Sequence, residues 1–391
     1  MDREAHDELG PPGLAEPLNA APAWRSVAAL NAVSLLAQLG QYGLGAVLLP
    51  LALQARGAGA GAVGVVGSAF WLGMLAGLLS AGLLVRALGY RGTVLAGLLC
   101  SAAAFVATPA LPHAVWALPS AAIGLGLGWR WIGNETWLYR LAPGHARGRI
   151  VGVHETLIGI ASVAGPLIVA ALGTLRADAF QVGAAACGAA LLPLVLARPL
   201  AAHEAPADGA AAWRRVGTGA WLAGIGGWIE GALLAQLGVA LAPQGLDGAD
   251  TARLLTAMGA GGMLCQVPLG WCADRCGSRT AAWWCAGAAA LATVALLVGP
   301  ASTPVLAAAA FAIGGASAGL LTLGMVHAAE GQDAAEIAQR VRQVSLLYTA
   351  LSACGPTAAG ALIEASGRPA ALWWLQAALV SVLVLLLARR R

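Results

Sequence analysis

Twelve apolar stretches, each close to the length of a membrane-spanning helix, follow one another along this sequence. A helix needs about 20 apolar residues to cross the ~30 Å hydrocarbon layer of a bilayer. Short turns containing Gly, Pro, Asp or Arg separate the stretches. We expect spans near residues 27–53, 62–85, 93–110, 114–139, 150–174, 180–197, 217–242, 252–273, 281–299, 304–326, 341–364 and 369–387. The sequence therefore predicts an all-α polytopic membrane protein of about twelve helices.

Composition excludes several other classes of protein. Of the 391 residues, 59% are hydrophobic and only 10% are charged, against roughly 25% charged in ordinary soluble domains. Lysine is absent, which excludes a Walker-A phosphate loop and a pyridoxal Schiff base. The seven cysteines lack the paired spacings and neighbouring histidines of a zinc site. We therefore expect no metal, no cofactor and no enzymatic activity.

Polar segments divide the chain into parts. Residues 1–24 are acidic and Pro-rich, and we expect a disordered cytosolic tail there. The longest polar interruption, residues 198–216, falls at the midpoint of the chain. It predicts a cytoplasmic linker between a six-helix half at 25–197 and a second six-helix half at 217–391.

Two motifs recur at nearly the same interval. Residues 82–91 follow the second span, and the similar residues 270–279 follow the eighth span, 188 positions later. A Gly-Pro pair at Gly165 in the fifth span returns at Gly355 in the eleventh span, 190 positions later. Parallel repeats about an axis normal to the membrane are the architecture of one large class of transporters. The two halves are therefore predicted to be pseudo-repeats.

The arginines predict the orientation of the chain. Most of the 22 basic residues, all of them arginine, fall on the side of the spans that holds both termini and the central linker. Only Arg56, Arg176, Arg253 and Arg368 fall on the opposite side, and Arg130 lies within a span. Because cytoplasmic loops carry the excess of basic residues, we expect both termini and the central linker to be cytoplasmic.

The second copy of the loop motif identifies a family. The sequence GWCADRCGSR matches the pattern G-x-x-x-D-R-x-G-x-R at every fixed position, and in this respect the chain resembles the major facilitator superfamily. In the first copy, Arg86 stands where that family has an acid. The resemblance assigns a conformational role to the loop residues Gly270, Asp274, Arg275, Gly277 and Arg279.

A second group of residues resembles a poorly characterised bacterial branch of this superfamily. The group consists of the string ETWL at 135–138, Ala-Pro at 142–143, Arg-Gly-Arg at 147–149 and His-Ala at 327–328. The resemblance implies a secondary transporter that acts as a monomer in the lipid bilayer, with no nucleic-acid partner. It implies a small organic substrate that is moved by alternating access across a bacterial cytoplasmic membrane, with protons as the coupling ions. A sensor that kept the fold but no longer transports is the alternative.

Glu230 is the first candidate for proton coupling. It lies near the middle of the seventh predicted span, and its helical stripe holds Gly227, Gly226 and Ala223. Small residues permit close helix packing, so this face is expected to point into protein and away from lipid. An acid removed from water takes up a proton more readily, which is the property that a proton carrier needs. A structural acid bonded to a neighbouring helix is the competing interpretation.

Glu135 and Arg130 are the charged candidates of the fourth span. The carboxyl group of Glu135 is a candidate either for proton exchange or for an ion pair with cytoplasmic arginines. Arg130 lies about 140° around the same helix, so its partner must come from another helix, with Glu155 or Glu230 as candidates. Arg130 has three possible roles. It could anchor an anionic group of the substrate, it could form a proton-sensitive ion pair, or it could form a permanent structural pair.

Uncharged polar residues predict a cavity. Asn31, Gln38 and Gln41 fall on one face of the first span at helical spacing. Trp131 in the fourth span and Tyr348 in the eleventh are further candidates for contact with a substrate. The alternative is hydrogen bonding between helices. Because these side chains are amide and aromatic groups with little charge, export of amphipathic compounds is favoured over uptake of nutrients.

His154 and Glu155 lie near the cytoplasmic start of the fifth span. An ionisable residue near the end of a span often reaches the headgroup region. We interpret both residues as interfacial and not as members of the transport site.

Overall fold

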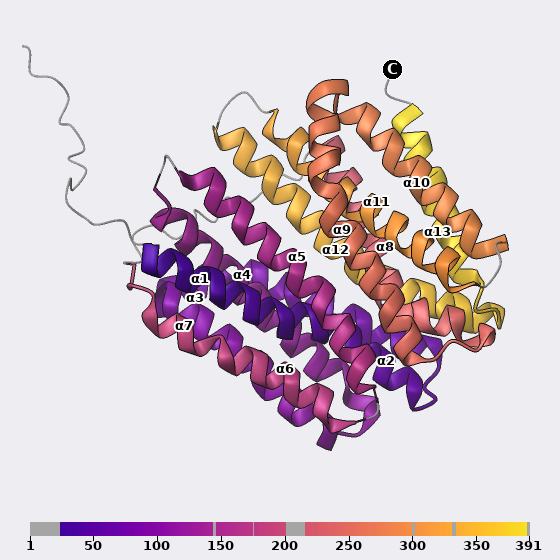
Figure 1. The fold of residues 1–391 in the computed structure, drawn as a ribbon, viewed down its shortest axis with the longest axis horizontal. Coiled ribbons are helices and arrows are strands. Elements are labelled where there is room, and N and C mark those ends of the chain that lie inside the picture. Colours follow the sequence, from indigo (N-terminus) through magenta and orange to yellow (C-terminus); the bar gives the residue numbers. More distant parts are fainter. Residues whose placement is uncertain are drawn as a thin grey trace, which may run out of the picture.

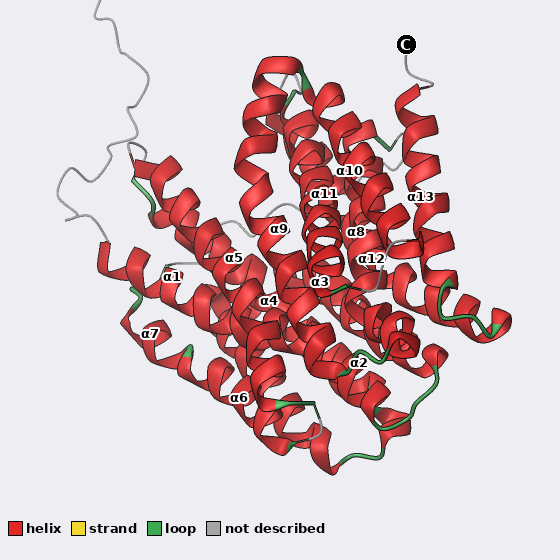
Figure 2. Cartoon of the chain, turned by 45° about the vertical axis from the view of Figure 1, so that its right-hand side comes forward, coloured by secondary structure: helices red, strands yellow, loops and turns green. Residues whose placement is uncertain are grey.

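The computed structural model describes residues 24–143, 146–174, 176–200, 216–298, 302–330 and 334–388. Within these residues the chain forms helices and no strand (Figure 2). The first half comprises α1 (Trp24–Gln38), η1 (Leu39–Leu44), α2 (Gly45–Ala55), α3 (Ala60–Ala107), η2 (Thr108–Ala110), η3 (His113–Val115), α4 (Ala117–Leu141), α5 (Arg147–Leu172), α6 (Ala177–Ala189) and α7 (Leu191–Leu196). The second half comprises α8 (Thr218–Leu241), η5 (Ala242–Gln244), α9 (Gly248–Cys276), α10 (Ser278–Val298), α11 (Thr303–Ala329), α12 (Ala334–Ser366) and α13 (Ala371–Ala388).

These helices account for the predicted spans. Within the described residues, nine helical segments are long and apolar enough to cross a membrane. One of them contains α3, whose 48 residues cover both the second and the third predicted span. Helices α4 and α9 cover the fourth and eighth spans but are not among the nine. The expected all-α fold of about twelve spans in two halves is confirmed. Nearly all of the predicted tail and linker lies outside the described residues.

Two glycines turn the chain at equivalent places in the two halves. Gly89 interrupts α3 with φ 69° and ψ 175°, and Gly277 separates α9 from α10 with φ 86° and ψ 148°. Residues with a Cβ rarely adopt such angles, so glycine is needed at both turns. The two glycines are 188 positions apart, which is the interval of the loop motif. The sequence repeat therefore corresponds to a repeat of backbone geometry.

The arginine after each of these turns makes an equivalent contact. The guanidinium group of Arg91 donates to the carbonyl oxygen of Val195, 3.1 Å away, near the end of the first half. The guanidinium group of Arg279 donates to the carbonyl oxygen of Leu387, 2.5 Å away, near the end of the second half. In each half, the turn between the second and third spans is therefore tied to the end of the sixth span.

The two halves meet at one side of the molecule and diverge at the other. In Figure 1 the first half (indigo to magenta) and the second half (orange to yellow) come together where α2 ends and spread apart where α1 begins. We call the diverging side, which holds the start of α1 and the end of α13, the chain-end side, and the other the far side. The halves therefore form a V that is open at the chain-end side.

Hydrogen bonds between the halves close the far side. The backbone N–H of Gly61 donates to Oε1 of Glu364 over 2.7 Å, joining the start of α3 to the end of α12. Nε2 of Gln236 on α8 donates to the carbonyl oxygen of Ala60 over 2.8 Å. We call this contact of α3 with α8 and α12 the far-side seal.

Close packing of α3 against α4 depends on glycine, and this predicts a large effect of adding one methyl group. A Cβ at Gly124 would overlap the carbonyl oxygen of Phe70. We expect Gly124→Ala to destabilise the fold, since overpacking costs about 1–3 kcal/mol. A Cβ at Gly287 would meet nothing within 4 Å, so Gly287→Ala, also within a helix, should be neutral or slightly stabilising. The thermal unfolding midpoints of the two purified variants in detergent test this, and equal midpoints would contradict it.

Candidate functional site

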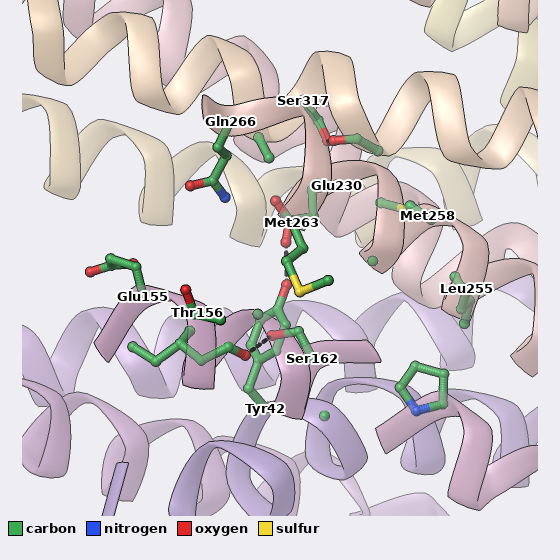
Figure 3. Close-up of a pocket in the computed structure, with 18 of the residues that line it drawn as sticks. Tyr42, Glu155, Thr156, Ser162, Glu230, Leu255, Met258, Met263, Gln266 and Ser317 are labelled. Carbon is green, nitrogen blue, oxygen red and sulfur yellow. Dashed lines mark hydrogen bonds between the residues drawn. The ribbon is translucent and has the colours of Figure 1, made fainter. Parts of the chain in front are cut away.

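A cavity of about 450 Å³ lies between the two halves. Both halves line it, and it extends from Leu255 near the start of α9, past Glu230 on α8, to Gly152 near the start of α5, on the chain-end side. Small-molecule sites have volumes of roughly 300–1,000 Å³, so the cavity has the size of a ligand site. Its lining includes Tyr42, Glu155, Ser162, Glu230, Met258, Met263, Gln266, Ser317 and Thr322 (Figure 3). Within the described residues, no group of three His, Cys, Asp or Glu could hold a metal ion.

Glu230 is the acid at the centre of this cavity. Its Oε2 accepts a hydrogen bond of 2.6 Å from the phenol of Tyr348 on α12. Its Oε1 accepts a hydrogen bond from the phenol of Tyr42, which belongs to η1 in the other half. Figure 3 shows Tyr42 reaching from the first half to the Glu230 carboxyl group of the second half. Both carboxyl oxygens are therefore bonded, and one of the bonds crosses between the halves.

Packing of a π-helical segment positions Tyr42. The segment η1, Leu39–Leu44, interrupts the first span. Its two inner glycines allow neighbouring helices to approach, because a Cβ at Gly40 would lie 2.9 Å from Sγ of Cys187 and a Cβ at Gly43 would lie 2.7 Å from the carbonyl oxygen of Ala161. Single turns of π-helix frequently occur at functional sites. Here the segment directs the tyrosine into the cavity.

Aromatic rings support the two phenols. The ring of Trp71 lies edge-on to Tyr42, with 6.1 Å between the ring centroids. It also lies edge-on to Tyr348, with centroids 6.0 Å apart. These distances are within the range of favourable aromatic pairs. Since Trp71 is only 2% exposed, it is a fixed support that holds both donors of Glu230.

Arg130 lies within the first half, and its partners are not those expected from the sequence. Its Nε donates to Oε1 of Gln41 over 3.0 Å, and its Nη2 donates to Oε1 of Gln38 over 2.7 Å. Within the described part of the chain, Arg130 forms no ion pair with Glu155 or Glu230. The expected acidic partner was wrong: two amide oxygens from the first span accept from Nε and Nη2, and Nη1 is buried with no hydrogen-bond partner within the described residues.

Glu135 and His154 form a second polar cluster in the first half. Nε2 of His154 lies 3.4 Å from Oε1 of Glu135, and its Nδ1 lies 3.1 Å from Oδ1 of Asn31. The His154 side chain is fully buried. The interpretation of His154 as an interfacial residue was therefore wrong. Glu155, its neighbour in sequence, lines the cavity between the halves.

The polar stripe of the first span faces other helices of its own half. Within the described residues, the cavity lining includes neither Asn31, Gln38 nor Gln41. Trp131 is also outside the lining, whereas Tyr42 belongs to it. Sequence reasoning missed Tyr42, although it follows Gln41 directly and is the only aromatic residue between positions 27 and 53.

The residues of the loop motif lie where α9 passes into α10, on the chain-end side. The guanidinium group of Arg275 stacks over the ring of Trp271, 3.9 Å from its centroid, and Asp274 is exposed. The motif occupies the positions Gly270, Asp274, Arg275, Gly277 and Arg279.

Comparison with known proteins places this geometry among membrane transporters. No family model matches the sequence. The uncharacterized MFS-type transporter YcaD of Salmonella newport (strain SL254) is 25% identical over 325 residues, which are 81% of this chain and 84% of that protein. A variant of the nucleoside transporter NupG superposes with a TM-score of 0.81 at 13% identity, covering 93% of this chain and 100% of that chain. A D-xylose–proton symporter superposes with a TM-score of 0.73 at 14% identity, covering 94% and 97%. The fold is that of major facilitator superfamily (MFS) transporters, and the relatives are transporters and not enzymes.

Proposed function

We propose that this chain is a secondary active transporter of the major facilitator type that moves a small organic molecule across a bacterial cytoplasmic membrane in exchange for protons. The observation that carries the proposal is the Glu230 carboxyl group, which lies in a cavity between two pseudo-repeats and is bonded to both of them. An ionisable group within the membrane is costly and usually functional. Export is favoured over uptake.

The bond between Tyr42 and Glu230 suggests how a proton is coupled to movement. The ionised carboxylate accepts from both phenols, one in each half. A protonated carboxyl group becomes a donor at one oxygen and no longer offers two charged acceptors. Protonation of Glu230 therefore weakens the contact between the halves and favours their rocking.

The remaining candidates receive supporting roles in this proposal. Arg130, Gln38 and Gln41 hold η1 in place, and so position Tyr42. Glu135 and His154 are proposed as a second proton-exchanging pair within the first half. Asn31 and Trp131 contribute to the rigidity of that half, and not to contact with the substrate.

The distribution of arginines supports an inward-facing state. If the chain-end side is cytoplasmic, the cavity opens to the cytoplasm and the far-side seal faces the outside. The loop motif then lies at the cytoplasmic surface, where it is proposed to guide the closing of the halves. The narrower bacterial branch and the monomeric state remain proposals. A sensor that does not transport is not favoured, because the relatives are named as transporters.

Transport is tested with ligands found by stabilisation of the purified chain. Metabolites and drugs are screened for an increase in the thermal unfolding midpoint, since a ligand that binds only the folded state stabilises it. Each ligand found is then added to proteoliposomes that enclose the pH-sensitive dye pyranine. We expect at least one ligand to move protons only when the protein is present. Ligands that bind without any flux of ligand or proton would contradict transport.

A further inference from the structure

The charged side chains that line the cavity all have the same sign. Within the described residues, Glu230 and Glu155 line it, and no arginine or histidine does. Glu230 lies in the middle of the cavity, between Leu255 and Glu155, and Glu155 lies nearer its opening on the chain-end side (Figure 3). A cleft lined by charges of one sign, with walls of low dielectric constant, concentrates ions of the opposite sign. An anion entering the cavity would meet two carboxyl groups and no compensating cation.

The rest of the lining suits an apolar body. Met258, Met263, Leu234 and Leu255 belong to the lining, and all four come from the second half. Methionine side chains are flexible and polarizable, and they adapt to ligands of different shape. Gln266 and Ser317 are uncharged polar residues of the lining, on the second-half side of the cavity (Figure 3). The cavity therefore combines a negative charge with apolar, adaptable walls.

The aromatic groups around Glu230 favour a positive charge at that position. The ring of Tyr42 belongs to the lining, and the ring of Trp71 packs edge-on against it. A cation over an aromatic face is attracted by the ring quadrupole. An ionised carboxylate has about four lone-pair sites, so Glu230 accepts from the two phenols and still has the capacity to bind a cation.

From this geometry we infer that the substrates are organic cations with an apolar body, and that the positive charge of the substrate lies against Glu230. The inference rests on the proposed function for its coupling step, because a proton and a cationic substrate would then compete for one carboxyl group. Binding of either neutralises Glu230, so that one proton entering displaces one substrate charge. The assignment of the substrate as an organic cation does not depend on that coupling step.

Two ions of equal shape and opposite charge test the inference by equilibrium binding. Tetraphenylphosphonium and tetraphenylborate are titrated into the purified full chain in detergent, and affinity is measured by calorimetry. We expect tetraphenylphosphonium to bind and tetraphenylborate to bind at least about tenfold more weakly. Equal binding of the two ions would show that the cavity selects on apolar character alone, and would overturn the inference.

Variants locate the charge that is responsible. Glu230→Gln should weaken the binding of tetraphenylphosphonium by about tenfold or more, since it removes the buried partner of the cation. Asp178→Asn removes a carboxylate from an exposed pair with Arg176 outside the cavity, so it should leave the affinity unchanged. Equal losses in the two variants would mean that net charge, and not the site, controls binding.

A second cavity variant keeps the test informative if Glu230→Gln does not fold. Gln266→Lys adds a positive charge to the wall near Glu230. We expect it to weaken tetraphenylphosphonium binding by about tenfold and to strengthen tetraphenylborate binding. No change for either ion would overturn the inference.

The two proposals fail in different ways. If the phosphonium ion does not bind but a neutral or anionic ligand moves protons in vesicles, the inference is wrong and the transport proposal stands. If the phosphonium ion binds through Glu230 but no ligand moves protons, coupled transport is wrong and the assignment of the ligand class stands.

Discussion

Glu230→Gln is expected to abolish proton-driven transport while substrate exchange between equal concentrations continues. The glutamine amide has nearly the shape of the protonated acid, and it can neither release nor accept the coupling proton. Like the protonated acid, it offers one acceptor oxygen and one donor group to Tyr42 and Tyr348, so the contact between the halves is as weak as in the protonated state and the halves can still rock. The cavity therefore continues to alternate but no longer responds to a proton gradient.

The measurement uses proteoliposomes with and without an imposed pH gradient, and a ligand identified by thermal stabilisation. Accumulation driven by the gradient should fall to the level of vesicles without protein. Counterflow of labelled ligand should persist when the ligand concentration is raised to offset the weaker binding of a cationic ligand. Asp178→Asn is the matched control, because it removes an exposed carboxylate outside the cavity. Gradient-driven accumulation that survives in Glu230→Gln would remove Glu230 from the coupling role.

The sequence predicted the architecture well because the bilayer constrains the helices so strongly. Lengths of about 20 apolar residues determine the spans, and two motifs at nearly one interval predicted the pseudo-repeat. The turns at Gly89 and Gly277 show this interval directly in backbone geometry. Within α3, the second and third spans are two helices that meet at a kink at Gly89, whose φ of 69° and ψ of 175° are not helical.

The candidate site was predicted less completely, and Gln38 and Gln41 show why. A polar side chain within a membrane is satisfied equally well by water in a cavity or by a group on another helix. Periodicity identifies the polar face of the first span, but it does not tell which neighbour that face meets. In the structure the face meets Arg130, and Tyr42 is turned to the cavity by a π-helical segment that regular helical counting does not anticipate.

The partners of Arg130 differ from the sequence-based expectation for a related reason. An acid is the expected partner, because a buried charge is usually paired with an opposite charge. A guanidinium group carries five N–H donors in a planar fork, and the two glutamine oxygens accept from two of its nitrogens. Glu230 was recognised from its depth and its small neighbours, but its tyrosine donors come from distant helices that only the fold brings together.

A disulfide across the far-side seal is expected to stop transport completely and reversibly. Oγ1 of Thr357 on α12 donates to Oγ of Ser68 on α3 over 2.7 Å, and the two helices belong to different halves. A disulfide has an S–S distance of about 2.05 Å, so cysteine sulfurs at these two positions need to move little to bond. In Ser68→Cys/Thr357→Cys, oxidation should therefore fix the state that is open at the chain-end side.

Flux in proteoliposomes should fall to background on oxidation with copper phenanthroline and recover with dithiothreitol. Each single variant should transport before and after oxidation. Ser68→Cys alone also tests for a bond with the native Cys354, which lies one helical turn before Thr357. Since the cavity is still accessible from the chain-end side, the oxidised double variant should bind ligand with unchanged affinity. Complete cross-linking with undiminished flux would mean that α3 and α12 need not separate, and alternating access by rocking of the halves would then be wrong.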